Sequence, residues 1–167
     1  MTKEIQISIA ETLKSKFGDD ILAVEVPYDF LTLTIRREKI YEIIQFLHDD
    51  ASLEFKFLTD ICGVHNPDAA EKFTLVYHLH NLHKNYRIRL KATAGGEHPE
   101  VSSITGIFPG ANWMERETFD FYGIHFKGHP NLKRILNVDD MLIYPLRKEF
   151  PLEDQVRLDK NDAQFGR

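Results

Sequence analysis

Hydrophobic residues at helix and strand spacings divide the first part of the chain into short elements. Over residues 5–17 an apolar side chain recurs every four positions, and Gly18 follows, which predicts a first helix. Residues 21–26 form a short apolar run, and residues 31–35 alternate apolar and polar side chains. These two runs predict a β-hairpin. Helical spacing returns over residues 38–49 and predicts a second helix that covers the same sheet face.

Four further segments have the character of strands. Residues 53–58 form a short apolar run, whereas residues 73–80 and 86–91 alternate strictly and are separated by a short polar connection. Residues 101–104 predict a last short strand. This order of elements predicts an α+β fold with a mixed, mostly antiparallel sheet, helices packed on one side, and an extended C-terminal arm.

The most aromatic stretch of the sequence also contains several charges, and its pattern predicts a helix of about three turns. Asn112 and Glu115 have the spacing of a capping box at its start, and Gly123 suits a left-handed cap at its end. Arg116 and Asp120 are four positions apart, which predicts an ion pair on the helix surface. Charges inside such an apolar segment need partners, so this helix is predicted to be half core and half contact surface.

The character of the chain changes after this helix. Residues 124–152, called the arm below, contain three prolines and many aliphatic and aromatic residues without a sustained period. A solvated tail has no use for so many apolar side chains, so the arm is predicted to cover a partner surface. The sequence therefore predicts a core domain of residues 1–123, a proline-rich docking arm, and a polar tail of residues 153–167 that is ordered only on a partner.

Charge and composition exclude several classes of protein. The formal net charge of −5 argues against a general nucleic-acid binder, although residues 124–148 are locally basic. Cys62 is the only cysteine, which excludes an intrachain disulfide and a cluster held by several thiolates. The chain contains no run of about 18 apolar residues of the kind that spans a membrane. These features predict a chain that is cytoplasmic or held at a membrane by other proteins.

Candidate chemistry in the sequence is weak. His78 and His80 share a strand face, with His83 nearby, but no cysteine or carboxylate stands at ligand spacing, so a metal site is a distant alternative. Glu115 and Glu117 point about 200° apart on a helix and do not form a catalytic pair. The glycines make neither a phosphate loop nor a dinucleotide fingerprint.

Charges, aromatic residues, glycine and prolines at fixed spacing form a specific signature in the second half of the chain. The residues that carry it are Glu115, Arg116, Glu117, Asp120, Phe121, Tyr122, Gly128, His129, Pro130, Lys133, Arg134, Pro145, Arg147, Lys148, Phe150 and Pro151. From about residue 53 to residue 152 the chain resembles the 30-kilodalton subunit family of bacterial respiratory complex I (NADH:quinone oxidoreductase). One departure is visible, because Ile143-Tyr144-Pro145 stands where the family pattern has a second Gly-His-Pro.

The resemblance implies a non-catalytic structural subunit of the peripheral arm of that proton-translocating complex. Its partners would be the quinone-site subunit and neighbouring cluster-carrying subunits, and the signature residues would contact partners or fix the fold. The chain itself would bind no cofactor, because FMN and iron–sulfur clusters belong to other subunits. Its place would be the cytoplasmic face of the bacterial inner membrane, reached only through the complex.

Two alternatives remain open at this point. The same architecture would suit the equivalent subunit of a ferredoxin-dependent photosynthetic complex or of a membrane-bound hydrogenase. A stand-alone metal-dependent enzyme built on the His78 strand is the remote alternative.

Overall fold

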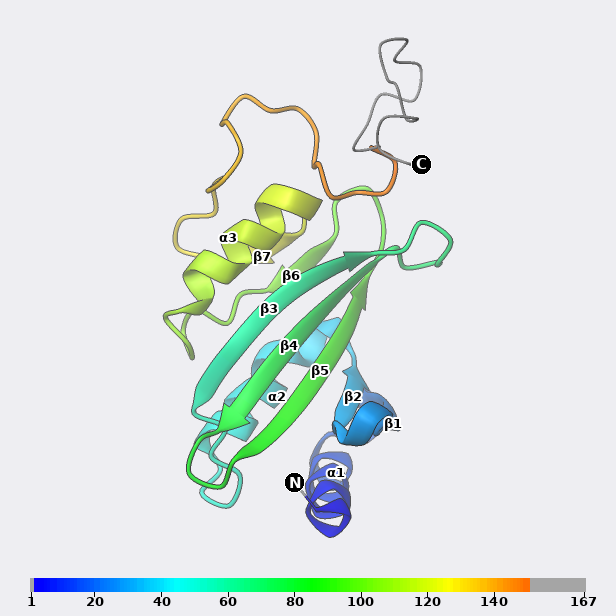
Figure 1. Ribbon diagram of the computed structural model, residues 1–167, viewed down its shortest axis with the longest axis vertical. Coiled ribbons are helices and arrows are strands. Elements are labelled where there is room, and N and C mark those ends of the chain that lie inside the picture. The colour runs from blue at the N-terminus through cyan, green and yellow to red at the C-terminus, as the bar shows by residue number, and fades with distance from the viewer. Residues whose placement is uncertain (1, 151–167) are drawn as a thin grey trace, which may run out of the picture.

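The computed structural model describes residues 2–150 and confirms the predicted α+β fold class. The helices and strands, in chain order, are α1 (Lys3–Phe17), η1 (Gly18–Asp20), β1 (Ile21–Glu25), η2 (Pro27–Asp29), β2 (Thr32–Ile35), η3 (Arg37–Lys39), α2 (Ile40–Asp49), β3 (Phe57–His65), β4 (Phe73–Asn81), β5 (Tyr86–Ala94), β6 (Glu100–Ser102), α3 (Ala111–Tyr122) and β7 (His125–Lys127). Figure 1 shows the twisted main sheet, with the arm at one end of the molecule and α1 at the other.

The main sheet has five strands in the order β1-β2-β5-β4-β3. Its strands pair antiparallel except for β2 and β5, which are parallel, so the two predicted hairpins are joined side by side. A second, two-stranded sheet pairs β6 with β7 in parallel. Because β7 belongs to this small sheet and Ile124 and Phe126 are buried in the main core, the first residues of the arm pack with the core.

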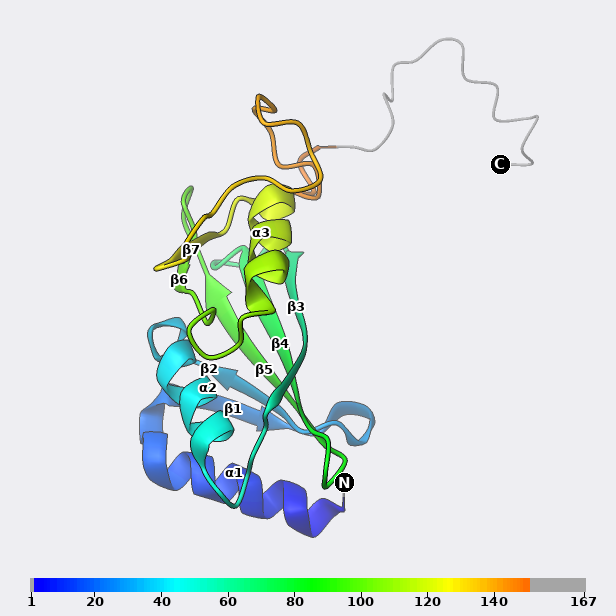
Figure 2. The same cartoon turned by 90° about the vertical axis from the view of Figure 1, so that its left-hand side faces the viewer.

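One hydrophobic core lies between the sheet and the helices, whose backbones Figure 2 shows from the side. The apolar face of α2 supplies side chains with no solvent exposure, and the alternate positions of β2, β4 and β5 face it. This is the arrangement that the period of four in the helices and the period of two in the strands predict. Fully buried members of the core include Leu13, Leu33, Ile40, Ile43, Ile44, Leu47, Leu75, Tyr77, Leu79 and Leu90.

The predicted strand over residues 53–58 is wrong in its position. Leu53 and Phe55 are buried, but Glu54 between them has a positive φ of 47°, and the amide groups of Leu53 and Glu54 donate to the carbonyl of Asp50 in a turn. The side-chain amide of Asn81 donates to Leu53 O at 2.7 Å and fixes this turn. The strand β3 begins at residue 57. Asp60 and Gly63 interrupt its apolar pattern, so the alternation that predicts a strand is hidden in the sequence.

Candidate functional site

The candidate site is the surface on which the arm packs against α3. The helix approaches β3 closely at Gly63, where an added Cβ would lie 2.7 Å from the ring of Tyr122 and 3.2 Å from the methyl group of Thr118. Glycine at this position therefore sets the distance between helix and sheet. At this same end, α3 stops at Gly123 with a left-handed φ of 73°, as predicted.

The predicted capping box is wrong. The N-cap of α3 is Gly110, without a side-chain cap, and Asn112 lies within the first turn. Glu115 does not reach back along the helix but crosses to the preceding loop, where its carboxylate accepts the Ile104 N–H at 2.7 Å and the Ser103 hydroxyl at 2.7 Å. The carboxylate thus ties α3 to the segment that follows β6.

Glu115 is fully buried, and burial raises its pKa to about 7, although the Ile104 N–H and the Ser103 hydroxyl act in the opposite direction. Burial also raises the pKa of Tyr77 well above its ordinary value, and the Glu115 charge adds to this. The glutamate consequently changes protonation near neutral pH, inside the fold and without contact with solvent.

This buried carboxyl predicts a pH-dependent stability. The folded state keeps the proton up to about pH 7, whereas the unfolded chain releases it near 4.5, so the contribution of Glu115 to stability is greatest below about 4.5 and falls as pH rises to 7. We expect the loss to approach about 3 kcal/mol. Glu115→Gln keeps an acceptor for Ile104 and should remove this dependence, so that the variant is the more stable protein at pH 8.

Denaturant unfolding of both proteins at pH 5 and pH 8 measures this difference. Glu117→Gln is the matched control, because Glu117 is exposed on the same helix and should leave the pH profile unchanged. Parallel profiles for the wild type and Glu115→Gln would contradict the assigned burial of a protonated carboxyl.

Asp120 is the centre of the first anchor of the arm. It is fully buried, and its Oδ2 atom accepts three consecutive backbone N–H groups, from Ile135 at 3.1 Å, Leu136 at 2.8 Å and Asn137 at 2.9 Å. The Oδ1 atom accepts a 2.7 Å bond from Arg134 Nη1. Burial alone would raise the pKa of Asp120, but these N–H groups and the guanidinium hold it far below its ordinary value.

Arg134 extends the anchor further along the arm. Its side chain is only 9% exposed, and its Nη2 atom donates to the carbonyls of Met141 at 2.7 Å and Ile143 at 3.0 Å. The guanidinium also lies 5.0 Å from the centre of the Tyr144 ring. One arginine therefore joins α3 to two separate parts of the arm.

The predicted ion pair between Arg116 and Asp120 is wrong. Arg116 donates instead to the backbone carbonyls of Lys133 at 3.1 Å and Arg134 at 3.0 Å, and it stacks on Trp113 at 5.1 Å. The physical reason is that both side chains face the arm, whose backbone offers carbonyls to the guanidinium and N–H groups to the carboxylate. The helix spacing placed the two charges on one face but did not make them partners.

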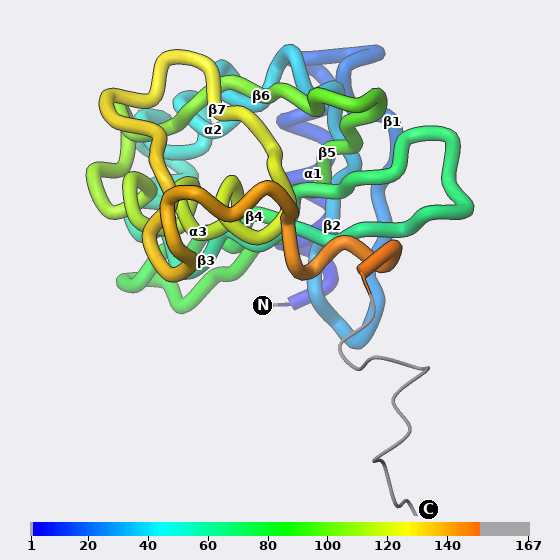
Figure 3. Tube along the Cα trace, turned by 90° about the horizontal axis from the view of Figure 1, so that it is seen from above, coloured from blue at the N-terminus to red at the C-terminus, as the bar shows by residue number. Residues whose placement is uncertain are grey.

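A second anchor holds residues 144–150. Arg147 Nε donates to Tyr122 O at 2.8 Å, and its guanidinium lies 4.9 Å from the Phe73 ring and 4.7 Å from the Tyr144 ring. The backbone N–H of Lys148 donates to His65 Nδ1 at 2.9 Å. Figure 3 shows the arm passing over α3.

His65 is a site residue that sequence reasoning missed. Its side chain is buried and stacks on Phe73 with ring centres 4.8 Å apart. Burial lowers the pKa of His65, and Arg147, Lys72 and Lys148 lower it further, while Glu149 acts in the opposite direction. The ring is therefore neutral, with Nδ1 free to accept. Its arm partner is 83 residues away in sequence, so no local pattern identifies it.

The other signature residues have smaller or outward-facing roles. The His129 ring accepts the Asn131 N–H at its Nδ1 atom and is hydrogen-bonded to Asn112 O through Nε2, which fixes the turn after Gly128 with its φ of 85°. The carbonyl of Phe121 accepts the Leu146 N–H. Pro145 and Phe150 are half-buried, the side chains of Glu117, Pro130, Lys133 and Lys148 are exposed, and Pro151 and residues 153–167 lie outside the described residues.

The anchors leave several apolar side chains of the arm exposed. Leu142 is 96% exposed, Leu136 65% and Val138 64%. Trp113, which supports Arg116 at the base of the first anchor, is also exposed. We call Leu136, Val138, Leu142 and Leu146 the outer face of the arm. Exposed apolar side chains that gather on one ordered segment are typical of a protein interface.

The histidines of the open sheet face are used in local contacts. His78 Nε2 accepts a hydrogen bond from Arg89 Nε at 2.9 Å, and His80 Nε2 is hydrogen-bonded to Asn85 Oδ1 at 3.1 Å. Within residues 2–150, no group of three or more histidine, cysteine or carboxylate side chains is arranged to hold a metal ion. The same residues contain no helix that is long and apolar enough to cross a membrane.

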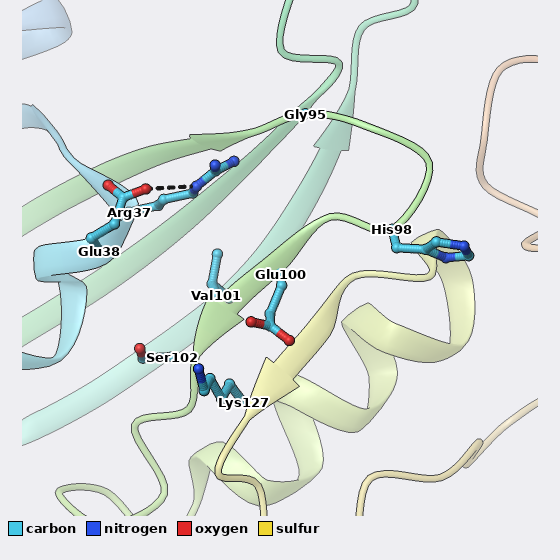
Figure 4. A pocket seen from close by; sticks show the side chains of 8 residues that line it. All are labelled: Arg37, Glu38, Gly95, His98, Glu100, Val101, Ser102 and Lys127. Atoms are coloured by element: carbon cyan, nitrogen blue, oxygen red, sulfur yellow. Dashed lines mark hydrogen bonds and ion pairs between the residues drawn. The ribbon is translucent and has the colours of Figure 1, made fainter.

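A polar pocket of about 370 Å³ lies between η3, the loop after β5, and the β6–β7 sheet (Figure 4). Arg37 is paired with Glu38 at 2.9 Å and approaches Glu71 at 3.6 Å. His98 points away from the other side chains of the pocket. The pocket therefore has as many acidic as basic side chains, and one pair of them, Arg37 and Glu38, is an ion pair.

Fold and site together define a class: an α+β domain whose long C-terminal arm is fastened to one helix by buried charges. The chain matches the family described as respiratory-chain NADH dehydrogenase, 30 Kd subunit, over residues 33–156. It belongs to this family, as the signature predicted, and is thus part of an oxidoreductase complex that contains further subunits.

Individual relatives agree with this assignment. A protein of Sinorhizobium medicae, named as the C subunit of NADH-quinone oxidoreductase, is 44% identical over 158 residues, which cover 93% of this chain and 78% of the relative. A protein of the same name from Caulobacter vibrioides is 44% identical and matches 85% of this chain and 72% of its own length. The relatives do not favour the photosynthetic or hydrogenase alternative.

Two solved structures share the fold. The trypsin-resistant fragment (1-134) of Nqo5 is 26% identical, with a TM-score of 0.63, and the match covers 74% of this chain and 98% of the fragment. A chain of a membrane-bound sulfane sulfur reductase, an archaeal respiratory membrane complex, has a TM-score of 0.73 over 87% of this chain and 85% of its own. At 22% identity this second likeness concerns the fold alone.

Proposed function

We propose that this chain is a non-catalytic docking subunit in the peripheral arm of NADH:quinone oxidoreductase. The α+β core carries the arm, the two anchors stiffen it, and the outer face of the arm binds neighbouring subunits. The partners would be the quinone-site subunit and adjacent cluster-carrying subunits, at the cytoplasmic face of a bacterial inner membrane. Electrons would pass through FMN and iron–sulfur clusters on those neighbours, without a cofactor on this chain.

The observation that carries the proposal is the internal use of the signature charges. Asp120, Arg134 and Arg116 bind the backbone of the arm, and Arg147 binds the end of α3. These groups therefore stabilise the position of the arm on α3. Meanwhile the most exposed arm side chain, Leu142, is apolar. An arm that is ordered before docking loses less conformational entropy when it binds, which favours assembly.

The trypsin resistance of the 1–134 fragment of Nqo5 supports a division between a compact core and a more accessible arm. The match to that fragment covers 74% of this chain. We infer that the core is a stable unit and that the arm reaches full protection only against neighbouring subunits.

Thiol labelling tests the proposal directly. In a Cys62→Ser background, Leu142→Cys should react rapidly with a maleimide in the isolated chain and at least about tenfold more slowly in the assembled complex, because the partner covers the outer face. Leu82→Cys, on the exposed β4–β5 turn, is the matched control for intrinsic reactivity. Equal labelling of Leu142→Cys in both states would remove the outer face as an interface.

A further inference from the structure

A second surface lies at the end of the molecule opposite the arm, where α1 and β1 meet (Figure 1). Among the described residues, β1 is an edge of the five-stranded sheet and pairs only with β2. A groove of about 590 Å³ runs between β1 and α1, and its apolar lining comes from Ile7, Ala10, Val24, Val26 and Leu31. The surface lies before residue 33, where the family match begins, and it is separate from the arm.

The groove is apolar and open. Ile7 is 57% exposed on the α1 side, and Val26 is 45% exposed at the end of β1. Charges line its rim in equal number, with Lys3 and Lys14 balanced by Glu11 and Asp29. The charge balance favours an occupant without net charge, whose apolar side chains enter the groove.

The loop at the end of the groove is held in a strained conformation. Tyr28 and Asp29 both have left-handed φ values, 54° and 61°, although neither is glycine, and Tyr28 is fully exposed. Such conformations persist only where the surroundings enforce them, and they cluster at binding sites. Here the buried Gln6 of α1 stabilises the conformation of the loop, because its side-chain amide donates to Asp29 O at 2.8 Å. The buried amide therefore holds the loop that carries the exposed Tyr28, whose neighbour Asp29 lines the groove.

We propose that this surface binds one extended segment of another subunit, which adds as a strand to the free edge of β1. A strand satisfies the unpaired backbone groups of an edge, and its alternate side chains can enter the groove, whereas a helix has no backbone groups to offer. A second copy of this chain is the alternative occupant, and the cross-linking test below distinguishes it from a segment of another subunit. Tyr28 packs over the added strand.

The inference rests on the proposed function in one respect, since it takes the chain to work within an assembly. Its test uses the assembled native complex. Tyr28→p-benzoylphenylalanine and, separately, Ile7→p-benzoylphenylalanine are irradiated, and the cross-linked peptides are identified by mass spectrometry. Both positions should cross-link to the same short segment of one other subunit, with apolar residues at alternate positions. Leu142→p-benzoylphenylalanine on the arm serves as the comparison.

Cross-links from Leu142 but from neither groove position would overturn this inference and leave the docking function of the arm standing. A cross-link to a helix or to a second copy of this chain would overturn it as well. Absence of cross-links from all three positions would overturn both proposals.

A charge placed in the groove gives an independent measurement. Val26→Lys should weaken retention of the cross-linked partner about tenfold, because the added strand would have to bury the ammonium group. Leu82→Lys, at an exposed position distant in sequence, should leave retention unchanged. Equal retention in both variants would count against the groove.

Discussion

Asp120→Asn should release the middle of the arm from α3. The substitution keeps the size of the side chain but removes the charge that three consecutive N–H groups and Arg134 share in a buried site. Losing one member of a buried pair costs about 3–5 kcal/mol, chiefly because the remaining charge is stranded. Amide hydrogen exchange at Ile135, Leu136 and Asn137 should therefore become at least about a hundredfold faster, up to the limit set by arm opening in the wild type.

Asp139→Asn is the matched control, since Asp139 is an exposed carboxylate on the same arm. Its exchange profile should be that of the wild type, because exposed charges contribute little. If amide exchange at residues 135–137 were as slow in Asp120→Asn as in the wild type, the anchor would not hold the arm.

Gly123→Ala should be nearly as damaging. The residue has a left-handed φ of 73°, and an added Cβ would lie 2.5 Å from the Tyr144 ring and 2.6 Å from Arg147 Nη2. The methyl group therefore adds backbone strain and displaces both side chains of the second anchor. We expect a loss of about 2–4 kcal/mol in unfolding free energy, measured by denaturant titration.

Gly128 provides a control that separates the two causes. It also has a left-handed φ, 85°, but an added Cβ meets nothing within 4 Å. Gly128→Ala should therefore cost only the backbone strain of about 1–2 kcal/mol. Equal losses in the two variants would contradict the close packing of Tyr144 and Arg147 on the end of α3.

The periodic elements of this fold were predictable, and its tertiary charge partners were not. The spacing of apolar residues placed α1, α2, β4 and β5 correctly, because each buries one face against a single core. The same reasoning failed for Arg116 and Asp120. Sequence spacing offers only the nearest neighbour on the helix, whereas the actual partners of Asp120 come from 14 to 17 residues downstream, in a segment without a period.

Two other errors have the same cause. Glu115 was assigned to its own helix, but its partners lie 11 and 12 residues earlier in the loop after β6. Leu53 and Phe55 are buried at alternate positions, as in a strand, but their segment forms a turn. The turn forms because Glu54 has a positive φ and because Asn81 donates a hydrogen bond from a distant strand. Each error concerns a polar contact between segments that tertiary structure brings together.

The anchors change the meaning of the signature residues. Arg116, Asp120, Arg134 and Arg147 were predicted to contact partners or to be part of the signature, and the structure has all four binding backbone groups of the same chain. Their role in our account is to shape the arm, while apolar side chains such as Leu142 meet the neighbouring subunit. In the proposed function these charges serve assembly and take no part in the chemistry.

Arg116→Ala tests this central claim most directly, because it frees the carbonyls of Lys133 and Arg134 without touching the outer face. The measurement is the yield of complex on a native gel together with NADH:quinone turnover per assembled complex, with Arg36→Ala on an exposed site as the control. We predict a yield reduced about tenfold or more and unchanged turnover in the complexes that do form. Normal yield with abolished turnover would contradict the account and assign this helix to catalysis.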